Sequence, residues 1–144
     1  MRLHRLAFLC IGIATVAAPP AGAQATLRNG TWTGSSVSNG GEEVRLSFEV
    51  RTSGDTISIV VAVPEQGSLP FTGIRLANDT LWFTIQPGAR ESVRRVDDTT
   101  RVSFEPSPDV NCVLLRQADG SFAGNCIVGD TGESAALRMV PPTQ

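Results

Sequence analysis

Apolar residues occupy every second position in two neighbouring segments, residues 44–50 and residues 57–63. A period of two is typical of β-strands that bury one face. A turn signal, Ser53-Gly54, separates the two segments, and no long amphipathic helix pattern occurs in the chain. The alternation therefore predicts a protein built from short strands and tight turns.

The first predicted hairpin is closed by Ser53 and Gly54 as a two-residue turn. The expected pairs are Val50 with Ile57, Phe48 with Ile59, and Leu46 with Val61. All three lie on one side of the hairpin, and a slip of one residue would turn them toward solvent. The apolar pattern therefore predicts which face is buried.

The second predicted hairpin turns at Asn78-Asp79. The expected pairs are Leu76 with Leu81, and Ile74 with Phe83. On the outer side Arg75 would face Trp82, an exposed cation–π contact worth about 0.5–1 kcal/mol. The alternative for Trp82 is a place in an interface or at a barrel end.

A third predicted hairpin carries two cysteines. Residues 110–117 and 121–128 have the pattern of strands, and a three-residue turn ending in Gly120 joins them. Counting back from the turn places Cys112 directly opposite Cys126, near enough for a disulfide. The short loop would contribute at most ~3 kcal/mol of stability. Two thiols without a histidine make a poor metal site, so we expect a disulfide and no metal.

Further strands are expected at residues 31–36, 101–105 and 133–140. Residues 88–98 fit either a short helix or an irregular segment, because Val93 and Val96 stand at helical spacing. Eight or nine short strands with tight turns predict an all-β fold, an antiparallel up-and-down meander. We expect it to close into a small barrel, because closure removes the open sheet edges.

The N-terminal residues have the layout of an export signal. Arg2 and Arg5 precede an apolar run over residues 6–18, and small residues end the segment at Ala23. The run is shorter than the ~20 residues of a spanning helix, which favours cleavage over an uncleaved anchor. We expect a signal peptide over residues 1–23, one domain over 24–144, a periplasmic or extracellular location, and no stable membrane insertion after cleavage.

Few groups in the exported chain can do chemistry at neutral pH. It has no Lys, no Tyr and no His, since His4 lies in the signal, and its two cysteines are expected to be paired. We therefore expect neither enzymatic activity nor a cofactor. Ten arginines against fourteen acidic residues leave a net charge of about −4. Nucleic acid is not an expected partner, because phosphate binding needs a positive field.

A tripeptide that begins at Gly30 and ends at Trp32 opens the first expected strand. It resembles the Gly-x-Trp motif of the calycins, which include lipocalins, fatty-acid-binding proteins and avidins. The resemblance implies a barrel in which Gly30 allows a tight entry and Trp32 closes one end. It also implies a basic residue of the last strand across that Trp, for which Arg138 is the candidate. If the apolar neighbours of Arg138 point inward, Arg138 points to solvent, and the sequence leaves both orientations open.

Two functions suit a small exported barrel. One is a carrier of small apolar molecules, with a lining that has no polar anchor: Phe48, Ile59, Val61, Ile74 and Phe83. The other is a module that binds a periplasmic protein; in outline it resembles the small bacterial metalloprotease inhibitors, although only residues 24–29 precede the barrel. A barrel packed solid by its own side chains is the third possibility. A void would favour the carrier, and a filled barrel with an ordered, exposed apolar edge would favour the protein binder.

Overall fold

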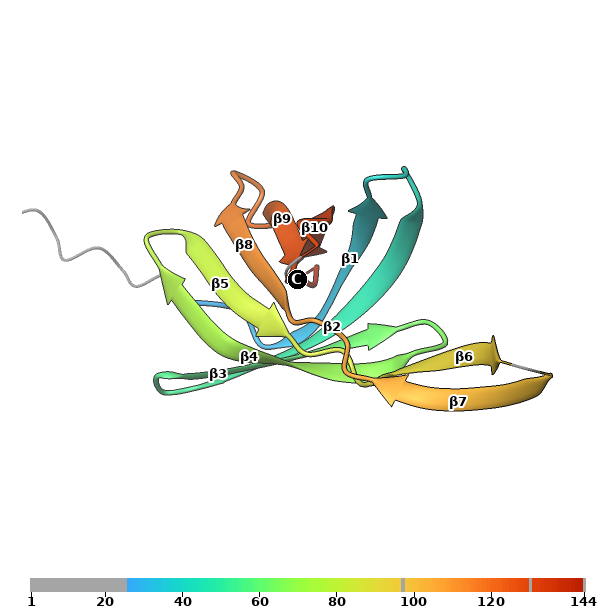
Figure 1. The fold of residues 1–144 in the computed structure, drawn as a ribbon. Coiled ribbons are helices and arrows are strands. Elements are labelled where there is room, and N and C mark those ends of the chain that lie inside the picture. The colour runs from blue at the N-terminus through green and yellow to red at the C-terminus, as the bar shows by residue number, and fades with distance from the viewer. Residues whose placement is uncertain (1–25, 97, 130, 144) are drawn as a thin grey trace, which may run out of the picture.

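The computed structural model describes residues 26–96, 98–129 and 131–143, and Figure 1 shows their fold. The strands formed by these residues are β1 (Gly30–Ser38), β2 (Glu43–Ser53), β3 (Thr56–Val63), β4 (Gly67–Ala77), β5 (Thr80–Ile85), β6 (Arg90–Val96), β7 (Thr99–Glu105), β8 (Val110–Arg116), β9 (Phe122–Val128) and β10 (Ser134–Val140). Eight strands close into a barrel in the order β1-β10-β9-β8-β5-β4-β3-β2. The predicted fold class is confirmed: within the described ranges the chain is all-β, antiparallel and closed. The expected signal peptide and its cleavage site fall in residues 1–25, outside these ranges.

Neighbouring barrel strands are consecutive in the chain, except where β8 pairs with β5 and where β1 closes against β10. The chain between β5 and β8 carries β6 and β7, which form a separate two-stranded sheet. Figure 1 shows this hairpin extending away from the barrel. The barrel thus hides its own strand edges, and the hairpin is the one insertion into the meander of the described residues.

The register of the β2–β3 hairpin differs from the predicted one by two residues. Gly54 has φ 57° and is the first of the two loop residues, so Ser53 pairs with Thr56 and Val50 pairs with Ile59. Glycine adopts a positive φ at no steric cost, so Gly54 suits the first position of this two-residue turn. Placing Ser53 in the loop was therefore wrong. Because the shift is even, the same side chains still face the interior.

The β4–β5 hairpin turns at Asn78 and Asp79, which both have positive φ, as predicted. Leu76 lies opposite Leu81 in the ladder. An irregularity between Thr72 and Arg75 interrupts the ladder beyond that point. The expected pairing of Ile74 with Phe83 therefore does not form, because a bulge shifts one strand against the other.

Residues 88–98 are neither a helix nor an irregular segment for most of their length, and that expectation was wrong. β6 covers Arg90–Val96 and pairs with β7, with Val93 opposite Val102. Val93 and Val96 stand three residues apart, but the neighbouring strand determines the conformation here. Asp98, with φ 55°, lies in the tight turn that joins the two strands.

Aromatic and aliphatic side chains pack together inside the barrel. Phe71 and Phe83 stack with ring centroids 4.0 Å apart, and Phe48 meets Phe71 edge-on at 6.1 Å. Trp32 and Phe122 lie 6.1 Å apart. The buried cluster also includes aliphatic side chains from the barrel strands, among them Ile59, Val61, Leu81, Leu114 and Met139. The described residues contain no helix long and apolar enough to cross a membrane.

Candidate functional site

The expected ligand lining forms the packed core of the barrel. Phe48, Ile59, Val61 and Phe83 are buried, and Ile74 is half-buried against them. The rings of Phe48, Phe71 and Phe83 contact one another across the space in which an apolar ligand would lie. Rings that contact one another in this region leave less space for a guest molecule.

Trp32 lies near the barrel end at which the N-terminal segment enters. Its side chain is buried, and its indole Nε1 donates a hydrogen bond of 2.9 Å to the carbonyl oxygen of Arg28. Leu27, just before β1, is 3% exposed and belongs to the core cluster. Residues 27 and 28, directly before β1, therefore contact the barrel.

Arg138 lies on the outer face of β10, between the buried Leu137 and Met139. Its guanidinium Nη2 is 2.8 Å from Asp119 Oδ2, and its side chain is 55% exposed. A different basic residue, Arg116 of β8, contacts the Trp32–Phe122 pair: its guanidinium carbon lies 4.7 Å from the centroid of the Phe122 ring. The barrel alternation puts Arg138 outside, so the structure does not place it across Trp32.

Asp119 organises the turn between β8 and β9. Its Oδ1 accepts hydrogen bonds from the hydroxyl and the backbone N–H of Ser121, a fully buried residue, and Arg138 contacts the other oxygen. The hydroxyl of Ser121 is the main cause that lowers the pKa of Asp119 below 3.8, with Arg138 adding to it. A carboxylate held by these donors fixes the turn and ties it to β10.

The predicted disulfide between Cys112 and Cys126 is confirmed. The two residues lie directly opposite in the β8–β9 ladder, and both are buried in the barrel wall. The predicted contact of Arg75 with Trp82 is also present, with 4.0 Å between the guanidinium carbon and the ring centroid. Within the described ranges, no three or more His, Cys, Asp or Glu side chains gather as a metal site would need.

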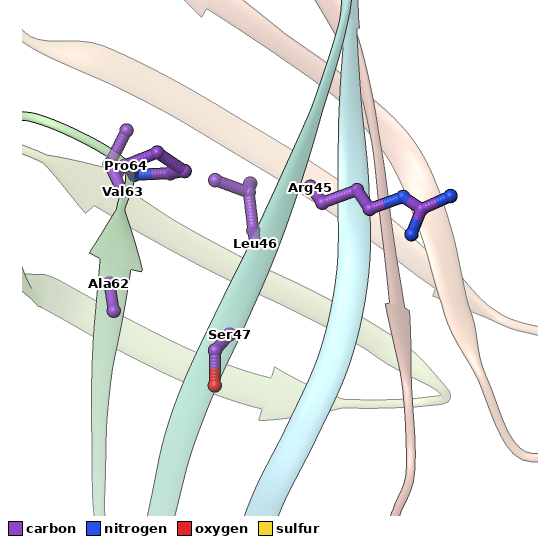
Figure 2. Close-up of a pocket in the computed structure, with 6 residues that line it drawn as sticks. All are labelled: Arg45, Leu46, Ser47, Ala62, Val63 and Pro64. Carbon is purple, nitrogen blue, oxygen red and sulfur yellow. The ribbon is translucent and has the colours of Figure 1, made fainter.

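A shallow groove opens at the barrel end where β2 begins and β3 ends. The volume of the groove is about 410 Å³. Leu46, Val63 and Pro64 line it, and Arg45, Ser47 and Ala62 lie at its borders. Figure 2 shows Leu46 directed toward Pro64 and Val63, and the Arg45 side chain directed away from them. The groove is mainly apolar and open to solvent, so it has few polar groups with which to orient a ligand.

Three exposed apolar side chains lie on the β6–β7 hairpin. Val93, Val102 and Phe104 are 62%, 51% and 72% exposed. Val93 lies opposite Val102, and Phe104 is two residues further along β7, so strand alternation puts all three on one face of the hairpin. A second group, Val113, Leu115 and Ile127, is exposed on the outer face of β8 and β9. Exposed apolar groups on an extended element are typical of interaction surfaces.

Comparison with protein-family models, curated protein sequences and solved structures finds no match to this chain. The site is therefore interpreted from its own geometry. The closed eight-stranded antiparallel barrel, with Gly30 and Trp32 at its first strand, is compatible with the calycin-like barrel that the sequence motif implied.

Two features of this site escaped the sequence interpretation. Leu27 precedes the first strand pattern, so its burial has no periodic signal. The hairpin face was missed because residues 88–98 were not assigned to a strand. The alternation in Val102-Ser103-Phe104 predicts that Val102 and Phe104 share a face. It does not predict that Val93 of the neighbouring strand joins that face.

Proposed function

We propose that this chain is an exported β-barrel binding protein that holds another polypeptide against the β6–β7 hairpin. The observation that carries the proposal is the apolar face of Val93, Val102 and Phe104 on a hairpin that extends beyond the barrel. A two-stranded sheet has no core of its own and gains stability when its apolar face is covered. The barrel is then a rigid support for the binding element.

The filled interior favours this function over a carrier. A carrier needs a space that its own side chains leave free, whereas Phe48, Phe71 and Phe83 contact one another inside this barrel. The lining has no polar group to orient a guest, and specific small-molecule sites usually have a few. The contrast between a packed interior and an exposed apolar hairpin supports a surface that binds protein.

Export is part of the proposal. The signal-like residues 1–23 support it, and the disulfide suits an oxidising compartment. We propose a periplasmic or extracellular location for the chain from Gln24 onward. For the secreted protein we expect a measured mass that corresponds to a chain starting at Gln24.

The test is a photo-crosslinker, p-benzoylphenylalanine, placed at Val93 in the expressed full-length chain. We expect an ultraviolet-dependent adduct with a discrete polypeptide, because Val93 lies within the exposed apolar face. The matched control carries the probe at Ser58, an exposed position on barrel strand β3. The double variant Val102→Ser, Phe104→Ser should weaken the Val93 adduct. No protein adduct at Val93, or equal adducts at both positions, would overturn the proposal.

The groove beside Leu46, Val63 and Pro64 favours a second candidate function, the carrier of a small apolar molecule. Such a ligand would lie at the barrel mouth and not in the packed interior. Binding there would be weak and poorly selective, since the groove is open and mainly apolar. Ligand titration separates this candidate from the first.

A further inference from the structure

The outer edge of β7 is an unused strand edge. Among the described strands, β6 and β7 pair only with each other. β7 runs from Thr99 to Glu105 without a proline, a glycine or a lysine. Proteins usually protect such an edge with a proline, a bulge or a cover, because it is a template for another strand. The edge of β7 therefore suits strand addition.

The hairpin geometry determines which residues of β7 face that edge. Val96 and Thr99 flank the two-residue turn and form its closing pair. Backbone groups along an antiparallel strand point alternately to its two neighbours. Thr100, Val102 and Phe104 therefore direct their N–H and C=O groups away from β6. A strand added at this edge can form backbone hydrogen bonds with Val102 and Phe104.

The sequence of β7 is complementary to itself in one antiparallel register. Centred on Ser103, two copies of β7 place Arg101 of each opposite Glu105 of the other, and Val102 opposite Phe104. Centred on Arg101, two arginines would oppose each other, which is unfavourable. Within the hairpin Arg101 already lies across from Arg94. Glu105 of a second copy would lie on the other side of Arg101.

We infer that a second copy of this chain pairs with β7, antiparallel and centred on Ser103, to form a four-stranded sheet in the order β6-β7-β7-β6. Two opposite-charge pairs form on one face of this sheet. On the other face Val102 and Phe104 of the two copies meet, which joins the two apolar faces into one. Four strands with a continuous apolar face meet the requirement for a stable sheet better than two.

The inference rests on the proposed function only through the shared hairpin. The edge of β7 takes the second copy, and the enlarged apolar face remains for the partner polypeptide. Self-association through the β7 edge and binding through the apolar face of the hairpin are therefore tested by separate experiments.

Sedimentation equilibrium of the purified mature protein tests the inference. We expect a dimer for the wild type, and at least about tenfold weaker association for Arg101→Glu and for Glu105→Arg, because each variant turns both ion pairs into like-charge pairs. A one-to-one mixture of the two variants restores both pairs and should dimerise. The double variant R101E/E105R should dimerise like the wild type. Arg51→Glu, at an exposed position of β2, is the charge-change control, and circular dichroism checks that each variant folds.

Each outcome decides the inference. A wild type that is monomeric up to about 1 mM would overturn it. So would a dimer that both single variants leave intact, or a mixture that fails to associate. A monomeric wild type whose Val93 probe still captures a different polypeptide would overturn the inference and leave the proposed function standing. A dimer paired through β7 that gives no Val93 adduct would support the inference and overturn the proposed function.

Discussion

Asp119 shows how one carboxylate can order a turn and link it to a distant strand. It accepts two hydrogen bonds from Ser121 and pairs with Arg138 of β10, 19 residues along the chain. Ser121 is fully buried although it is polar, because its hydroxyl has this acceptor. Arg138, the candidate that the calycin resemblance implied for a place across Trp32, thus lies outside the barrel and contacts this turn.

The lowered pKa of Asp119 predicts a pH dependence. The unfolded chain takes up a proton at this group near pH 3.8, before the folded chain does. Its contribution to stability is therefore present above that pH, and it is lost as the pH falls through the lowered folded pKa. We expect Ser121→Ala to move the pKa of Asp119 back toward 3.8, as measured by NMR titration. Ser58→Ala is the control, and an unchanged pKa in Ser121→Ala would contradict this account.

At the scale of elements, glycines set how closely the barrel strands approach. A Cβ at Gly124 of β9 would overlap the carbonyl oxygen of Val113 and lie 2.9 Å from the Cα of Leu114. On β1, which β10 alone separates from β9 in the barrel, a Cβ at Gly34 would overlap the carbonyl oxygen of Arg138 and lie 2.9 Å from the Phe48 ring. Backbone atoms cannot move aside as a flexible side chain can. These two strand contacts therefore depend on the absence of a side chain.

We expect Gly124→Ala to lower the free energy of unfolding by about 1–3 kcal/mol or more, through overpacking between β8 and β9. Chemical denaturation with the disulfide intact measures the change. Gly88→Ala is the matched control, because a Cβ at Gly88 meets no atom within 4 Å. Equal stability of the two variants would show that the strands can separate without loss.

At the scale of the whole molecule, a barrel with a packed core carries a protruding hairpin, and in the function that we propose the barrel supports the hairpin that binds. The aromatic core gives the barrel rigidity, and the hairpin places its apolar face away from that core. A carrier would show the reverse arrangement, with a hollow interior and a polar exterior.

This arrangement predicts that apolar ligands will not stabilise the protein. We expect fatty acids to leave the melting temperature unchanged, and native mass spectrometry of the protein purified from its compartment to show no bound small molecule. Stabilisation that Leu46→Arg abolishes would instead place a ligand in the groove beside Val63 and Pro64. The variant Arg45→Ala, whose side chain points away from the groove, is the control.

Much of the fold was predictable from local pattern. Alternation identified the strands, and turn residues located the Asn78-Asp79 and residue 118–120 turns. The pairing of Cys112 with Cys126 followed from counting along one hairpin. The β2–β3 register was missed by two residues, because Ser53-Gly54 and Gly54-Asp55 are both plausible loops. The conformation of Gly54 decides between them.

The sequence by itself determined most of the strands, the buried face and the disulfide, because each depends on a short-range period or on a count across one turn. The tertiary structure alone decided that the interior is filled, that Arg138 lies outside and that β6 and β7 leave the barrel. Those outcomes depend on which distant strands meet: β1 must close on β10, and β8 must pair with β5. Strand closure brings aromatic rings from different hairpins into one space, and that meeting has no signature in any single segment.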